Sequence, residues 1–129
     1  MIVLDASVVI AHLWARDAHH ERATEFFRSH VDDEFLVHPL TLAEILVGPM
    51  CANRGEFAQA AIDSLGIREW EVPAGSAGRL ARMRVDTAAK MPDCCVLEAA
   101  SVTRSPVATL DRELAAAAAS VGVTVLDLG

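Results

Sequence analysis

The sequence lacks any hydrophobic run long enough to cross a membrane. Its longest apolar stretch, residues 6–15, follows Asp5 and contains His12, whereas a membrane-spanning helix needs about 20 apolar residues. No basic segment precedes this stretch, so a secretory signal is not expected. We therefore expect a cytoplasmic protein that does not associate with membranes.

Cysteine is scarce, with three residues in the chain. Cys94 and Cys95 are adjacent and Cys51 stands alone, so the chain has no CxxC pattern of the kind found in zinc and dithiol redox sites. Few cysteines without such a pattern are typical of a reducing compartment. We expect all three to be small buried apolar side chains.

Positive charge is also scarce. The chain has 11 Lys and Arg against 18 Asp and Glu, which gives a net charge of -7. Domains that bind nucleic acid through bulk electrostatics usually have a basic face, so that class is disfavoured, although a local basic patch is compatible with the total. Several carboxylates around one metal cation would explain part of the acidic excess, because the cation would balance them.

The chain does contain enough apolar residues for one domain covering residues 1–129. Of its 129 residues, 53% are hydrophobic, and no internal repeat or linker divides it. Short apolar segments alternate with helical patterns, which predicts an α/β fold with a five-stranded parallel sheet. The strands are expected at 2–4, 35–37, 67–72, 107–110 and 123–126. The helices are expected at 7–14, 19–30, 41–50, 56–65, 75–90, 93–103 and 112–120.

Four carboxylates are predicted to meet at one edge of this sheet: Asp5, Glu44, Asp93 and Asp111. If the first and fourth strands are neighbours, Asp5 and Asp111 face each other across the crevice at their carboxyl ends. Clustered carboxylates repel one another, so such a set indicates a hard divalent cation. Magnesium or manganese fits, whereas zinc does not, because no His or Cys accompanies the acids.

Each acid also has a purely structural interpretation. Asp5 and Asp111 precede predicted helices and are typical N-caps. Asp93 follows a proline in a first helical turn, where the helix dipole favours an acid. Thr41 and Glu44 match a capping box, in which Glu44 would stabilise a helix start at Thr41.

Other side chains leave two interpretations open. Arg79, Arg82, Arg84 and Lys90 on the predicted helix 75–90 either guide an RNA backbone toward the acids or form a solvated face. Arg112 either contacts a phosphate or pairs with a site carboxylate. Trp14, Phe26 and Phe27 either pack in the core or form a surface for a partner.

Four segments together resemble the acidic motifs of PIN-domain ribonucleases, and most closely those of VapC toxins from VapBC toxin–antitoxin systems. They are LDAS at 4–7, TLAEI at 41–45, MPDCCVLEAA at 91–100 and ATLDREL at 108–114. The resemblance implies a three-layer α/β/α PIN-like domain that cuts RNA internally with Mg²⁺ or Mn²⁺.

The same resemblance assigns roles to residues. It implies that Asp5, Glu44, Asp93 and Asp111 are the catalytic, metal-binding carboxylates, with Ser7 and Thr109 as polar neighbours that support them. It also implies a transfer or ribosomal RNA substrate, a homodimer, and a VapB-type antitoxin lying across a groove. Some apolar side chains on the first two helices would then be exposed.

Three other enzyme or cofactor classes fit less well. A phosphatase with Asp5 as nucleophile needs a second acid where Ser7 stands, and a receiver domain needs a lysine after a late strand, whereas the only lysine is Lys90. The missing glycine-rich loop after the first strand excludes a dinucleotide-binding domain. The remaining alternative is a catalytically silent PIN-like scaffold that binds RNA or protein and uses its acids as helix caps.

Overall fold

The computed structural model describes residues 1–129 and contains one five-stranded sheet, which confirms the predicted parallel sheet. The strands lie in the order β3-β2-β1-β4-β5, and every neighbouring pair is parallel. Each strand has three residues: β1 (Ile2–Leu4), β2 (Phe35–Val37), β3 (Ile67–Glu69), β4 (Val107–Thr109) and β5 (Val125–Asp127).

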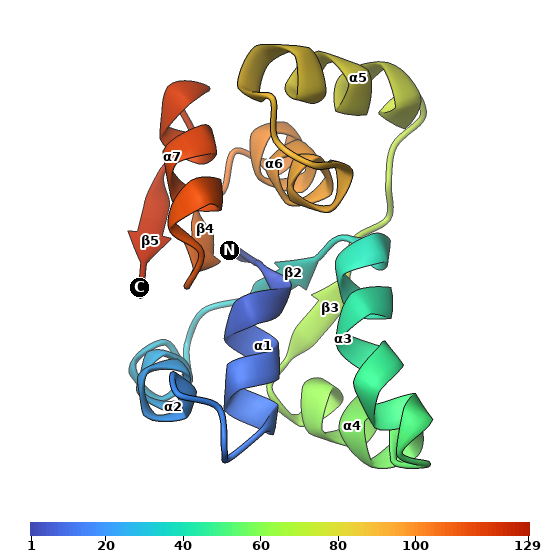
Figure 1. Ribbon diagram of the computed structural model, residues 1–129, viewed down its shortest axis with the longest axis vertical. Coiled ribbons are helices and arrows are strands. Elements are labelled where there is room, and N and C mark those ends of the chain that lie inside the picture. The colour runs from blue at the N-terminus through green and yellow to red at the C-terminus, as the bar shows by residue number, and fades with distance from the viewer.

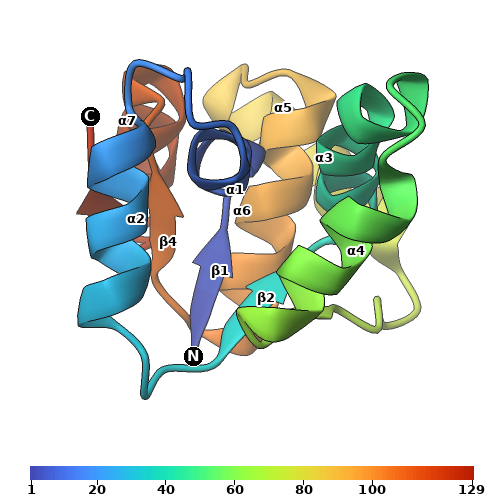
Figure 2. The same ribbon diagram turned by 90° about the horizontal axis from the view of Figure 1, so that it is seen from below.

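Helices cover both faces of this sheet, as the α/β/α prediction requires. They are α1 (Ala6–Leu13), α2 (His20–Ser29), α3 (Pro39–Cys51), α4 (Gly55–Ser64), α5 (Ser76–Thr87), α6 (Met91–Thr103) and α7 (Arg112–Ser120). One apolar cluster joins the sheet to α1 through α4, and a second joins it to α6 and α7. Figures 1 and 2 show α1 and α2 on the opposite side of the strands from α5 and α6.

The central strand β1 contributes to both clusters. Ile2 and Leu4 belong to the cluster under α1 and α2, whereas Val3 belongs to the one under α6. Successive side chains of a strand point to opposite faces, so an unbroken apolar run is what a strand between two helical layers needs. All three side chains are buried.

The predicted capping box at Thr41 is wrong. Helix α3 begins at Pro39, and His38 is its N-cap, with its side chain accepting a hydrogen bond from the Leu40 N–H. Proline is favoured in the first turn of a helix because its fixed φ suits that turn and it has no N–H to satisfy, so the helix starts earlier than expected. Thr41 lies inside the helix, and its buried Oγ1 has no hydrogen-bond partner.

The predicted helix 75–90 is in fact interrupted. Helix α5 ends at Thr87 because Ala88 has a φ of 58°, and Lys90 becomes the N-cap of α6. Lys90 therefore does not continue a basic stripe along α5. The prediction of three buried cysteines is wrong for Cys51, which is exposed. No helix combines the length and apolar character of a membrane span.

Candidate active site

The carboxyl ends of β1 and β4 bring Asp5, Thr109 and Asp111 together. These two strands are neighbours in the sheet, so the residues that follow them share one edge. Asp5 Oδ2 accepts hydrogen bonds from Ser7 Oγ at 2.7 Å and from Thr109 Oγ1 at 2.9 Å. Asp5 occupies the N-cap position of α1 without capping it through its side chain. Two hydroxyls therefore fix the orientation of this carboxylate.

The same hydroxyls connect the two strand ends. Ser7 Oγ accepts a hydrogen bond from the Leu110 N–H at 3.2 Å, and Thr109 Oγ1 accepts one from the Asp111 N–H at 2.9 Å. Each hydroxyl thus donates to Asp5 and accepts from the loop after β4. A hydroxyl has one donor and two acceptor positions, so both groups are satisfied and the loop is held against Asp5.

Asp111 does act as the N-cap of α7. Its Oδ1 accepts from the N–H groups of Glu113 at 2.8 Å and Leu114 at 3.4 Å, as the structural interpretation of this residue predicted. These contacts satisfy free amides of the first helical turn. No protein donor contacts Oδ2, so this oxygen is available to a ligand while Oδ1 caps the helix.

Asp93 lies in the first turn of α6 and is buried, whereas Glu44 lies on α3 and is exposed. Burial, and after it the charges of Asp5, Asp111 and Glu44, together raise the pKa of Asp93 to about 6, against the opposing charge of Lys90. Burial and the charge of Asp5 also raise the pKa of Glu44, again against Lys90. Asp5, Glu44 and Asp111 therefore all lie within electrostatic range of Asp93.

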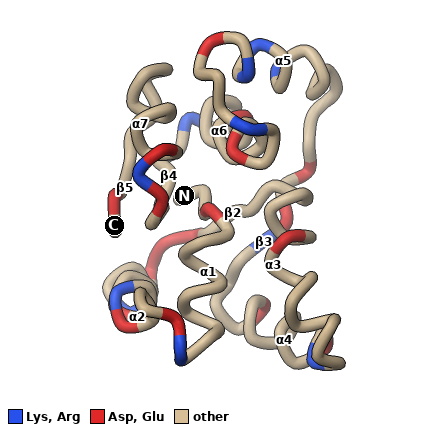
Figure 3. Tube along the Cα trace, viewed as in Figure 1, with Lys and Arg blue, Asp and Glu red and all other residues tan.

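This group has the donor chemistry of a hard cation site. The donors are all carboxylate oxygens, and their mutual repulsion would be relieved by a divalent cation. Figure 3 shows acidic positions on α3, at the start of α6 and between β4 and α7, around one region of the fold. The side chains do not form a closed group of three or more metal ligands, so a cation here would draw them closer together.

The PIN domain family model matches residues 2–120. The chain belongs to the PIN domain family. No curated protein sequence matches the chain. A toxin–antitoxin complex from Klebsiella pneumoniae contains a similar chain, with a TM-score of 0.80 and 16% identity, covering 100% of this chain and 98% of that one.

Two further solved structures have the same fold. VapC20 of Mycobacterium tuberculosis, described as a sarcin–ricin loop cleaving toxin, has a TM-score of 0.75 and 18% identity, covering 91% of this chain and 95% of that one. FitAcB from Neisseria gonorrhoeae has a TM-score of 0.74 and 20% identity, covering 99% and 98%. At these identities the likeness establishes the fold of this PIN domain.

Cationic side chains differ in their distance from the acids of this PIN domain. Lys90 and Arg84 line a polar pocket of about 370 Å³ together with Asp93 and Glu113. Arg79 instead donates hydrogen bonds within the protein, and Arg82 faces Asp86 at 3.7 Å. Arg112, directly after Asp111, is exposed. Arg84 donates to the carbonyl oxygens of Ala88 and Ala89, so Lys90 is the cation that borders Asp93 without an internal hydrogen bond.

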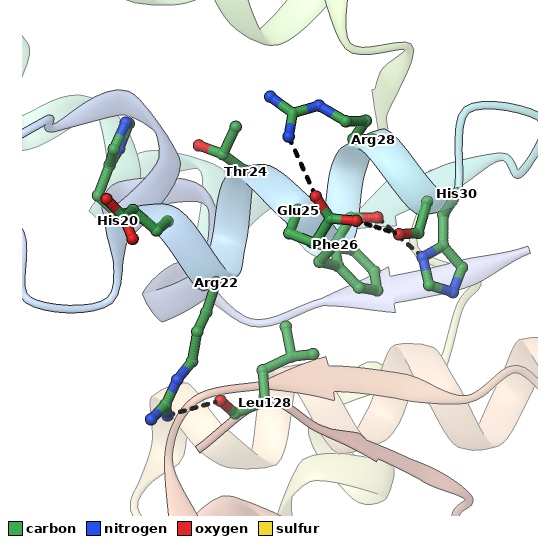
Figure 4. A pocket seen from close by; sticks show the side chains of 10 residues that line it. His20, Arg22, Thr24, Glu25, Phe26, Arg28, His30 and Leu128 are labelled. Atoms are coloured by element: carbon green, nitrogen blue, oxygen red, sulfur yellow. Dashed lines mark hydrogen bonds and ion pairs between the residues drawn. The ribbon is translucent and has the colours of Figure 1, made fainter.

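A depression of about 910 Å³ runs along α2 and includes none of the four acids. Figure 4 shows its lining, in which Arg22 donates to the Leu128 carbonyl at 3.1 Å and Glu25 contacts Arg28. These contacts are internal and satisfy the charged groups. This depression lacks the convergent polar groups of a catalytic site.

An apolar groove of about 620 Å³ runs between α1, α3 and α4, with Glu44 among its lining residues. Trp14 and Phe57 also line it and are 61% and 67% exposed, whereas Phe26 and Phe27 are buried in the core. Exposed aromatic side chains in a groove are typical of an interaction surface. The sequence did not single out Phe57, because its neighbours have no pattern that distinguishes an exposed aromatic from a core one.

Proposed function

We propose that this PIN domain is a metal-dependent endoribonuclease in which Asp5, Glu44, Asp93 and Asp111 hold Mg²⁺ or Mn²⁺. The observation that supports it is the placement of Asp93, a buried carboxylate whose pKa is raised by burial and by the charges of Asp5, Asp111 and Glu44. Perturbed carboxylates gathered at one edge of an α/β sheet mark functional sites. When bound, the cation would neutralise phosphoryl charge and favour deprotonation of a water molecule.

Neighbouring groups of the chain orient the carboxylates of Asp5 and Asp111. Ser7 and Thr109 hold Asp5 in one position, and Asp111 keeps one oxygen free while the other caps α7. Glu44 makes no side-chain hydrogen bond and is exposed. We assign it the role of orienting the attacking water. The water oxygen adds to the phosphorus in line as the bond from phosphorus to the leaving oxygen breaks, and a water proton ends on that leaving oxygen.

Cations next to the acids would contact the RNA backbone. Of the candidates Arg112, Arg79, Arg82 and Lys90, the proposal relies chiefly on Lys90 and Arg112, because Lys90 borders Asp93 in the polar pocket and Arg112 follows Asp111. Phosphate contacts position a nucleic acid without reading its sequence. The RNA would therefore run across the start of α6 and the start of α7.

The biological role that we propose is that of a VapC-type toxin. The similar structures include toxin–antitoxin complexes, and VapC20 is described as cleaving the sarcin–ricin loop. A transfer or ribosomal RNA substrate, a VapB-type antitoxin and a homodimer belong to this proposal. The groove containing Trp14 and Phe57 supports it, because an apolar groove beside Glu44 would let an antitoxin segment cover the acids.

Exchange of one carboxylate tests the activity. Wild type, Asp93→Asn and the control Asp32→Asn, which changes an exposed acid away from the site, are incubated with total RNA in Mg²⁺, Mn²⁺ or EDTA. Wild type and Asp32→Asn should cleave only with metal, and Asp93→Asn should lose cleavage by about 100-fold or more, since several catalytic terms depend on the cation. Cleavage at wild-type rate by a folded Asp93→Asn protein would instead indicate the non-catalytic scaffold.

The toxin role needs a separate test. A small protein encoded immediately upstream should co-purify with this chain and suppress its cleavage, and Phe57→Asp should weaken that association because it places a charge in the apolar groove. Cleavage without such an inhibitor would support the nuclease and contradict the toxin role.

A further inference from the structure

Helix α6 contains a second acid that the four-carboxylate site does not include. The Glu98 side chain is 0% exposed, and it lies between Arg79, whose Nε donates to Oε2 at 2.9 Å, and His38, whose Nε2 lies 3.0 Å from Oε1. A buried carboxylate is strongly unfavourable unless it is paired and hydrogen bonded. Glu98 therefore depends on partners from two other segments of the fold.

The His38 ring is a neutral link in this network. Its Nδ1 accepts the Leu40 N–H at 3.1 Å and must present a lone pair there. The ring proton then resides on Nε2 and is donated to Glu98. His38 thus caps α3 with one nitrogen and binds α6 with the other, while Arg79 supplies the charge that balances Glu98.

Arg79 completes the network from α5. Besides Glu98, its guanidinium donates to the carbonyl oxygens of Ala74 and Pro73, each at 2.7 Å. Gly75 permits this approach, since it has a φ of +93° and a Cβ at that position would lie 3.2 Å from Arg79 Nη1. The guanidinium is therefore held in place by the turn before α5, which keeps it directed at Glu98.

The two helices joined by this network also contain two of the proposed metal ligands. Glu44 lies on the helix that His38 caps, and Asp93 lies on the same helix as Glu98. The His38–Glu98 contact is the one side-chain hydrogen bond between the start of α3 and α6. This contact therefore contributes, together with the packing of α3 against α6, to the separation of Glu44 and Asp93.

We propose that Glu98 is a positioning residue, which fixes α3 against α6 through His38 and so keeps Glu44 within reach of a divalent cation bound at Asp93. This inference rests on the proposed metal-dependent function. Glu98 itself lies in the interior and touches neither RNA nor cation. Its effect is on metal affinity, because groups that orient metal ligands contribute to that affinity nearly as the ligands do.

The variant His38→Asn should keep the N-cap of α3 and remove the hydrogen bond to Glu98. Asparagine is a strong N-cap and can still accept the Leu40 N–H, but its side chain is too short to reach Glu98. Mn²⁺ binding is measured from the electron paramagnetic resonance signal of the free ion. We expect the affinity for Mn²⁺ to fall about 10-fold or more. We expect kcat for RNA cleavage to fall with it and KM for RNA to stay unchanged.

The controls decide between positioning and simple stability. His30→Asn changes a half-buried histidine that bonds only within α2, and it should bind Mn²⁺ like wild type. Glu98→Gln keeps the shape but offers one acceptor to two donors, so it should weaken Mn²⁺ binding in the same direction, and it replaces His38→Asn if that variant does not fold. Wild-type Mn²⁺ affinity in either folded variant would overturn the positioning role of Glu98 and leave the proposed function standing. A wild-type protein that binds no Mn²⁺ would overturn the proposed function as well.

Discussion

At the scale of single residues, Asp111 combines two tasks in one carboxylate. One oxygen caps α7, and the other has no protein donor and is available to the proposed metal site. Loss of the side chain removes a cap worth about 1 kcal/mol together with a potential ligand. The substitution Asp111→Ala would therefore change stability and activity together. Asp93 caps no helix, so its substitution tests activity more directly.

The charged form of Asp93 should lower the free energy of unfolding of the metal-free protein at neutral pH. Its pKa is raised to about 6 in the folded protein from an ordinary value of 3.8, chiefly by burial. The folded state thus favours the protonated form, so the contribution of this group to stability is full below pH 3.8 and is lost as the pH rises through about 6. Asp93→Asn should exceed wild type in free energy of unfolding at pH 7.5 by about 2 kcal/mol.

Urea unfolding in EDTA measures this difference at pH 5 and at pH 7.5. The gap between the two proteins should widen with pH. His12 has a lowered pKa because of burial and its neighbour His20, so its own contribution is lost as the pH falls, but it is present in both proteins and cancels. A gap that is the same at both pH values would contradict the raised pKa of Asp93.

The residues that could be predicted from the sequence are those placed by strand order. Asp5 and Asp111 follow β1 and β4, which are neighbours in the sheet, so their proximity follows from the topology of a parallel fold. Glu98 could not be found in this way. A single glutamate within an apolar helix has no signal for its partners, and Arg79 and His38 are 19 and 60 residues away.

At the scale of elements, α5 differs from the other helices in the burial of its side chains. None of its side chains is buried, whereas α6 beside it has eight buried residues. Arg79 holds α5 through Glu98 and two carbonyl groups. Segments with few buried side chains open locally at low free energy cost, so we expect the hydrogen bonds of Arg79 to contribute much of the local stability of α5, beside the packing of Met83 on the core.

Arg79→Met should therefore raise amide hydrogen exchange in residues 76–87 by about 10-fold or more, while the strands keep their protection. The physical reason is that methionine retains some packing but makes none of the three hydrogen bonds. Arg68→Met removes an exposed contact with Glu34 on the sheet, and it serves as the control that leaves exchange in α5 unchanged. Equal exchange in both variants would show that α5 is held by other contacts.

The limits of the helices were predictable where apolar periodicity is strong, and wrong where local chemistry decides. Helix α4 ends as expected before Gly66, which has a φ of 74°. Because of Pro39, α3 starts two residues earlier than expected. Ala88 ends α5 early, with a positive φ that the sequence pattern does not indicate. Backbone conformation at a non-glycine residue depends on tertiary contacts, which explains this error.

At the scale of the whole molecule, a chain with net charge -7 is proposed to bind a polyanion. Such binding must rely on a few well-placed cations, of which Lys90 is the one that faces the acids. Lys90→Met should weaken RNA binding and lower the slope of log affinity against log salt by about 0.7, the value for one phosphate contact on a single strand.

That measurement uses Asp93→Asn as the background, so that RNA is bound without cleavage. Arg28→Met changes an exposed cation on α2 that pairs with Glu25, and it should leave both affinity and slope unchanged. Equal salt slopes for the Lys90 variant and its background would mean that the phosphates lie elsewhere on the surface.

The contrast between a buried sheet and an α5 without buried side chains also bears on how such a chain can diverge. Substitutions in β1 or β2 disturb two layers at once, whereas most of those in α5 alter only the surface beside the acids. Mutation can therefore change the surface next to Asp93 at little cost in folding, while the proposed metal site stays constant. One scaffold could in this way acquire new RNA preferences in few evolutionary steps.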